Sequence, residues 1–89
     1  MIINKTQILN NICYTELVYD RINKKLNSNF TKSEIETMLF GVIKETQEKF
    51  FLKNGKNYYI SNTENDIGIT VNSYTYRIIT VDRITKIKK

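Results

Sequence analysis

Aromatic and basic side chains alternate in two stretches of the second half of this sequence. The first stretch reads Gly-Lys-Asn-Tyr-Tyr from position 55, and the second reads Asn-Ser-Tyr-Thr-Tyr-Arg from position 72. Tyrosine rings stack on unpaired nucleobases, at about 1 to 3 kcal/mol per base, while lysine and arginine neutralise phosphates. The pattern therefore predicts a contact surface for nucleic acid or for a nucleoprotein complex. Its candidate residues are Lys56, Asn57, Tyr59, Asn72, Tyr74, Tyr76, Arg77 and Arg83.

Histidine is absent from the chain, and Cys13 is the only cysteine. This composition excludes Ser-His and Cys-His nucleophile pairs, imidazole metal sites, an internal disulfide and a cysteine zinc site. Helix starts and turns account for the carboxylates, so we expect neither a metal nor any other cofactor. We expect Cys13 to be a small buried side chain.

Two other functions fit the same residues. A ribonuclease without histidine or metal would use cations to stabilise the phosphorane and a phenol or carboxyl group to transfer protons. Its candidates are Lys56, Tyr76, Arg77 and Asp82, on a barnase-like or RelE-like outline. Alternatively, the surface could bind a protein, as an inhibitor of a host nuclease from a mobile element, of the anti-defence or anti-CRISPR kind. The net charge of +5 does not separate these hypotheses, and the non-enzymatic binding module is the leading one.

A chain of 89 residues is long enough for one domain with a modest core. Its longest apolar run, residues 38–43, is far shorter than the roughly 20 residues of a membrane-spanning helix, and its first residues lack a secretion signal. We therefore expect a soluble, cytoplasmic protein without a membrane partner. Within one domain of residues 1–89, residues 1–6 are predicted to be weakly ordered and residues 84–89 to form a basic tail. An exposed edge strand could pair two copies, so a homodimer stays open.

Two helices are predicted in the first half of the chain. Thr15 is expected to cap the first, whose apolar side chains recur on one side until the turn-forming residues 27–29. Thr31 and Glu34 have the spacing of a capping box, which begins a second helix with an apolar stripe at intervals of three and four residues. Upstream, the apolar positions of residues 8–12 indicate no more than a short helical turn.

Four strands are predicted in the second half. Residues 49–53 and 56–61 are joined by Asn54-Gly55, a dipeptide typical of two-residue hairpin turns. Residues 67–71 alternate, with the odd-numbered side chains facing the core. Residues 74–83 form the last strand, and alternation places Ile79 and Val81 on one face and Tyr74, Tyr76, Ile78 and Thr80 on the other.

Sequential strands with short turns indicate an antiparallel meander, which is stable only when one of its faces is covered. The expected fold is therefore α+β, with two helices packed on one face of a four-stranded antiparallel meander, in the order ααββββ. We expect the other face to carry tyrosines, threonines and charged side chains, which makes it the predicted basic, tyrosine-rich contact surface.

Several short motifs are similar to those of a known family. They are Gly55-Lys56-Asn57-Tyr58-Tyr59, Ile69-Thr70-Val71-Asn72 followed by Tyr76 and Ile78-Ile79-Thr80, and the earlier Thr15-Glu16-Leu17 and Arg21-Ile22. Over residues 15–83 the chain resembles a family of small bacterial proteins known only as a domain of unknown function. The resemblance implies no activity. Members of that family tend to carry Trp in place of Tyr58 and Ala-His-Lys in place of Val81-Asp82-Arg83, so any acid-base role of that histidine would not transfer to this chain.

Overall fold

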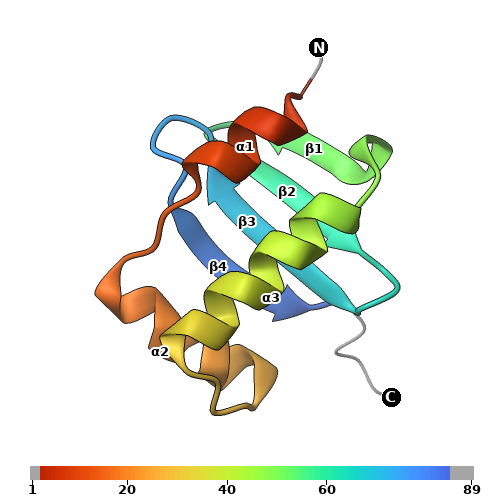
Figure 1. Cartoon of the computed structure of the whole chain (residues 1–89). Coiled ribbons are helices and arrows are strands. Elements are labelled where there is room, and N and C mark those ends of the chain that lie inside the picture. The colour runs from red at the N-terminus through yellow and green to blue at the C-terminus, as the bar shows by residue number, and fades with distance from the viewer. Residues whose placement is uncertain (1–2, 85–89) are drawn as a thin grey trace.

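The computed structural model describes residues 3–84. They form three α-helices, one 3₁₀ turn and four strands, arranged as Figure 1 shows. The elements are α1 (Lys5–Asn11), α2 (Glu16–Leu26), α3 (Lys32–Glu45), the 3₁₀ turn η1 (Glu48–Phe50), β1 (Phe51–Asn54), β2 (Asn57–Asn62), β3 (Ile67–Asn72) and β4 (Ile78–Arg83). The predicted α+β fold is confirmed. Within residues 3–84, no helix has the length and apolar character needed to span a bilayer.

The four strands form one antiparallel sheet in the order β1-β2-β3-β4, which confirms the meander. Phe51, Ile60, Ile69 and Val81 lie opposite one another across the sheet, and all four are buried. Because side chains alternate along a strand, this row fixes which residues face the core and which face away.

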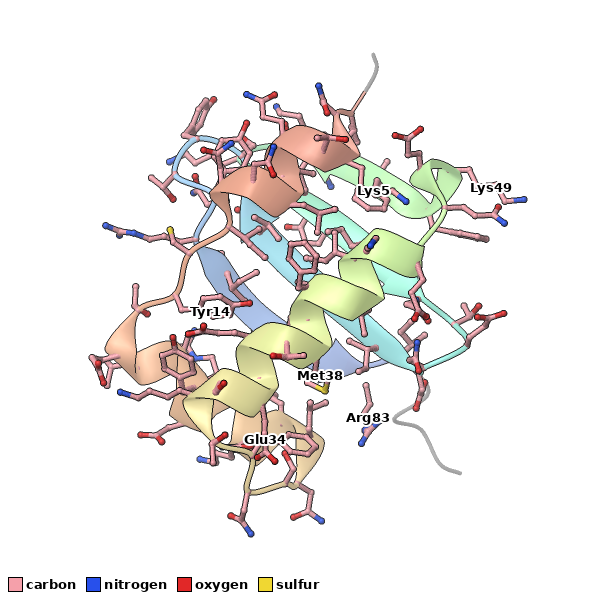
Figure 2. All side chains as sticks on the ribbon, in the orientation of Figure 1. Lys5, Tyr14, Glu34, Met38, Lys49 and Arg83 are labelled. Carbon is pink, nitrogen blue, oxygen red and sulfur yellow. The ribbon has the colours of Figure 1, made fainter. Side chains whose placement is uncertain are left out.

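The helices lie on one side of the sheet. Figure 1 shows α1 and α3 crossing that face, while α2 lies beside β4. Ile22, Ile35 and Leu39 are completely buried, and Met38 of α3 packs at the margin of this core (Figure 2). No helix of residues 3–84 covers the opposite face of the sheet.

Both predicted N-cap residues stand where a helix begins. The Oγ1 of Thr31 accepts the backbone N–H of Glu34 at 3.1 Å, and the Glu34 carboxylate accepts the N–H of Thr31 at 2.8 Å. The predicted capping box is therefore confirmed. Thr15 is the N-cap of α2, as predicted, although its side chain makes no capping hydrogen bond.

Helix α1 corrects the expectation of two helices to three. Asn4 caps it by accepting the N–H of Gln7 at 3.0 Å, and Ile8 is 1% exposed beneath it. Burial of Ile8 stabilises a short segment whose own helix propensity is weak. Residues 5 and 6, which were predicted to belong to a weakly ordered N-terminus, lie in the first turn of this helix. The tail expected at residues 84–89 lies outside the described residues, apart from Ile84.

The first and last strands differ from their predictions. Residues 48–50 form η1, so β1 begins only at Phe51. Residues 73–75 form a turn and Arg77 an isolated bridge, so β4 begins at Ile78. A bulge pairs Val71 with Ile78 but Thr70 with Thr80, which leaves Ile79 as an extra residue in β4. Ile78 and Val81 therefore both face the core, and the strict alternation predicted for this strand is wrong.

Candidate functional site

Two turns meet at one end of the sheet. The backbone N–H of Ser73 donates to the carbonyl oxygen of Lys56 at 2.7 Å, and Asn57 pairs with Asn72. We call residues 54–57 and 72–77 together the turn end. It contains most of the predicted site residues, namely Lys56, Asn57, Asn72, Tyr74, Tyr76 and Arg77.

The side chain of Asn72 organises the second of these turns. Its Oδ1 accepts the backbone N–H groups of Tyr74 and Thr75, at 2.8 and 2.9 Å. The N–H of Asn72 donates to the carbonyl oxygen of Arg77 at 2.9 Å, which closes the loop. This Asx turn holds the backbone so that Tyr74 projects outward, with 72% of its surface exposed. Asn72 thus acts as a positioning residue, since its side-chain oxygen is already occupied.

Tyr76 also has a positioning role. Its φ of 60° is the left-handed conformation, which costs a residue with a Cβ about 1 to 2 kcal/mol. The ring is partly buried against the core, with its centroid 6.5 Å from that of Tyr58, and burial raises the pKa of the Tyr58 phenol. The ring of Tyr76 is therefore less available to a ligand than the ring of Tyr74.

Cys13 connects the turn end to the helices. Its backbone N–H donates to the carbonyl oxygen of Tyr76, and its own carbonyl accepts the N–H of Ile78, both at 2.9 Å. These bonds form a parallel bridge between Cys13 and Arg77 at the edge of β4. The side chain of Cys13 is exposed, so the expectation that it is buried is wrong. The segment between α1 and α2 is therefore held at the edge of β4 by the backbone of Cys13, whose side chain lies at the surface.

Carboxylates are absent from the sequence around the turn end. Residues 53–60 and 72–79 contain Lys53, Lys56 and Arg77 but no Asp or Glu, and residues 3–15 contain no Asp or Glu either. Lys53 bends over the hairpin and donates to the carbonyl oxygen of Gly55 at 3.1 Å. The positive charge at this end is therefore not neutralised by a local ion pair.

The uncovered face of the sheet is not basic, contrary to the prediction. The register places Leu52, Asn54, Asn57, Tyr59, Ser61, Gly68, Thr70, Asn72, Thr80 and Asp82 on it. Among the described strand residues, none on this face is Lys or Arg, and Tyr59, 39% exposed, is its one tyrosine. Arg83 pairs with Ile67 at the far end of β4, so the structure separates it from the turn end.

The four ribonuclease candidates are not gathered into one site. Lys56 and Arg77 are exposed at the turn end, whereas the Tyr76 ring packs against the core. Asp82 lies farther along β4 and pairs with Lys25 of α2, with 3.0 Å between Oδ1 and Nζ. In residues 3–84, no group of three or more acidic or cysteine side chains is placed to hold a metal ion.

A cluster of phenols and charges that the sequence reasoning missed joins α2 to α3. The Tyr19 hydroxyl donates to Oε2 of Glu36 at 2.6 Å, and its ring stacks on that of Tyr14 with 5.5 Å between centroids. Lys32 lies 5.3 Å from the Tyr19 ring centroid and pairs with Glu16 at 2.8 Å. Desolvation, together with the hydrogen bond to Glu36, raises the pKa of Tyr19 to about 12. Both phenols therefore stay protonated near neutral pH, and the contacts of this cluster hold α2 against α3.

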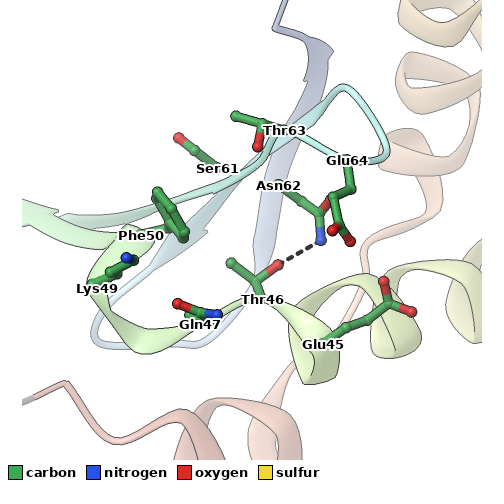
Figure 3. Close-up of a pocket in the computed structure, with 9 residues that line it drawn as sticks. All are labelled: Glu45, Thr46, Gln47, Lys49, Phe50, Ser61, Asn62, Thr63 and Glu64. Atoms are coloured by element: carbon green, nitrogen blue, oxygen red, sulfur yellow. Dashed lines mark hydrogen bonds between the residues drawn. The ribbon is translucent and has the colours of Figure 1, made fainter.

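A polar pocket of about 350 Å³ lies at the opposite end of the sheet, where α3 ends near the β2–β3 turn (Figure 3). At its base, Nδ2 of the buried Asn62 donates to Oγ1 of Thr46 at 2.9 Å, and Thr46 donates to the carbonyl oxygen of Val42 at 2.6 Å. Asn65 donates through its backbone N–H to Oδ1 of Asn62 at 2.9 Å and through its side chain to Glu45 at 3.2 Å. The bonds between Asn62 and Thr46 and between Asn65 and Glu45 join the end of α3 to β2 and to the β2–β3 turn, so they hold α3 to the sheet.

Comparison with known proteins finds a family of unknown function. No curated protein and no solved structure matches the chain. A family described as protein of unknown function (DUF3781) matches residues 6–82, which run from α1 into β4. Because this match spans nearly the whole described fold, the chain belongs to the DUF3781 family.

Proposed function

We propose that this protein is a non-enzymatic module that binds single-stranded nucleic acid through its turn end. One observation carries the proposal. Tyr74 is 72% exposed, follows Ser73, whose N–H donates to the carbonyl oxygen of Lys56, and precedes Arg77 by three residues. The two turns that carry these residues, 54–57 and 72–77, contain no Asp or Glu. An exposed ring that shares two adjoining turns with exposed cations matches the two requirements of single-stranded nucleic acid, which are a surface for base stacking and positive charge for the backbone.

Each exposed side chain has a separate role in this proposal. The Tyr74 ring stacks on one unpaired base, which a duplex would keep inside its own stack. Lys56 provides a mobile point charge, and Arg77 a planar guanidinium, for neighbouring phosphates. Asn72 and Tyr76 hold the loop, which reduces the entropy lost when Tyr74 is ordered on a base.

Binding to labelled oligothymidylate, followed by fluorescence anisotropy over a salt series, tests the proposal. Tyr74→Ala should weaken binding about 5- to 150-fold, the equivalent of about 1 to 3 kcal/mol of lost stacking. Lys56→Gln and Arg77→Gln should each weaken binding and lower the slope of log K against log salt by about 0.7, the value for one phosphate contact on a single strand.

Arg83→Gln is the matched control, because it removes the same charge from an exposed residue at the other end of β4. It should leave both affinity and salt slope close to those of the wild type. Equal effects of Arg77→Gln and Arg83→Gln would show that only net charge matters and would contradict a site at the turn end. A wild type that binds no single strand at low salt would contradict the function itself.

The same surface could instead contact a protein, such as a nuclease, and one further experiment separates the two outcomes. The wild type is used to capture partners from a lysate with and without prior nuclease digestion. The proposal expects capture to disappear after digestion. A protein that is retained after digestion by the wild type but not by the Tyr74→Ala variant would favour the inhibitor hypothesis over nucleic-acid binding.

A further inference from the structure

A shallow pocket lies next to the turn end, between α2 and the start of β4. Its volume is about 230 Å³, and Arg21 and Arg77 both line it. Val18 and Ile78 are buried beneath it, Ile79 is partly buried, and Leu17 forms a wall with 76% of its surface exposed. The pocket therefore combines an aliphatic lining with two guanidinium groups.

The two arginines are positioned differently, Arg21 by a side-chain hydrogen bond to the sheet and Arg77 through its backbone. Nη1 of Arg21 donates to the carbonyl oxygen of Ile79 at 3.4 Å, which draws the guanidinium over the bulged part of β4. Arg77 is fixed through its backbone, since its N–H donates to Oγ1 of Thr75 at 3.3 Å and its carbonyl accepts the N–H of Asn72. A guanidinium has five N–H donors, so both groups keep donors for an anion.

Of the three carboxylates in α2 and β4, Glu16 and Asp82 are paired with lysines, and Asp20 is not among the residues that line the pocket. Glu16, in the first turn of α2, binds Lys32 of α3 at 2.8 Å. Asp82, farther along β4, binds Lys25 at 3.0 Å. Arg21 and Arg77 are the charged residues among those that line the pocket.

We infer that this pocket is a second nucleotide subsite, which binds the nucleotide next to the one whose base stacks on Tyr74. The inference rests on the proposed function and extends it. Arg77 belongs to both the turn end and the pocket. One single-stranded nucleic acid can therefore contact Tyr74 and the pocket at the same time. A phosphate would bind Arg77 and Arg21, while the sugar and base of the same nucleotide cover Leu17 and Ile79. Guanidinium groups suit this role because they bind phosphate oxygens in pairs.

The test compares Arg21→Gln with Lys24→Gln, which removes the same charge from an exposed residue of the same helix that does not line the pocket. With oligothymidylate as the probe, Arg21→Gln should lower the salt slope by about 0.7 and weaken binding severalfold, while Lys24→Gln should change neither. Arg21→Lys keeps the charge but loses the planar fork, so it should fall between the wild type and Arg21→Gln. Thermal unfolding of each variant confirms that the fold is retained.

The outcomes separate this inference from the proposed function. If the wild type binds and Tyr74→Ala does not, while Arg21→Gln binds like Lys24→Gln, the second subsite is wrong and the turn end stands. If the wild type binds no oligothymidylate, both proposals fail. If it binds a glutamate-rich peptide in an Arg21-dependent way and no oligonucleotide, the pocket takes carboxylates, and the nucleotide assignment is overturned.

Discussion

At each end of the sheet, an asparagine side chain stabilises a turn, but the two turns have different roles. Asn62 and Asn72 each accept backbone N–H groups from the residues that follow them, at 2.9 Å from Asn65 and at 2.8 Å from Tyr74. Asn62 is buried, and its amide also binds Thr46, so its turn fastens α3 to the sheet. Asn72 is only partly buried, and its turn displays Tyr74. A turn motif therefore does not reveal a site by itself, and what the turn exposes decides its use.

The largest effect that tests this contrast is expected from Asn62→Ala. The substitution removes a buried amide together with its hydrogen bonds to Thr46 and Asn65, and at about 0.5 to 1.5 kcal/mol for each bond this should cost about 1 to 3 kcal/mol of unfolding free energy. Urea unfolding measures that loss, and oligonucleotide binding should stay unchanged at temperatures where the variant is folded. A folded Asn62→Ala variant with weakened oligonucleotide binding would show that the two ends of the sheet are coupled. It would contradict the assignment of separate structural and binding roles to them.

A smaller effect is expected at Tyr76, where backbone strain can be separated from ring packing. Tyr76→Ala and Tyr76→Gly both lose the contact with Tyr58, but only glycine adopts a φ of 60° freely. The glycine variant should therefore be the more stable of the two, by about 1 kcal/mol, which is the reverse of the usual order in a regular element. Paired urea titrations measure the difference. Equal stabilities would mean that the loop relaxes out of the left-handed conformation when the ring is removed.

Local patterns predicted much of the fold because local forces determine those parts. The capping box of Thr31 and Glu34 and the inward face of β3 are set by neighbouring residues, and both were found as expected. The bulge at Ile79 and the burial of Ile8 depend on distant partners, so alternation and propensity missed them.

The candidate site shows the same division between near and distant contacts. The cations and the tyrosine of the turn end could be recognised from their composition. Their predicted place on the uncovered face of the sheet was wrong for most of them, because the last strand begins only at Ile78 and residues 74–77 lie before it. Arg21 was not among the predicted site residues, since the fold brings it to Arg77 across most of the chain and no local pattern marks such a pair.

A weaker, pH-dependent effect is expected where α2 meets α3. The pKa of Tyr19 is about 12 in the folded protein and about 10 in the unfolded chain, so the protonated phenol favours the folded state. The resulting stability is fully present below pH 10 and is lost as the pH rises toward 12. Tyr19→Phe should make the fall in stability over this range shallower, as measured by thermal unfolding at fixed pH values. An unchanged pH profile would show that Tyr14 or Tyr58 dominates the alkaline transition.

The smallest effect is expected from Asp82→Asn. This variant tests whether the nucleic acid contacts the uncovered face of the sheet as well as the turn end. Asp82 is the one carboxylate that the register places on that face among the described residues, and it pairs with Lys25. Its side chain is about a third exposed, so loss of the pair should cost only about 0.2 to 1 kcal/mol of stability. If the nucleic acid binds at the turn end, removal of the Asp82 charge should leave the affinity for oligothymidylate unchanged at about 150 mM salt, where the Debye length is about 8 Å. A clear gain in affinity, persisting at that salt concentration, would mean that the nucleic acid crosses the sheet face toward Asp82, and the site would then have to include Tyr59.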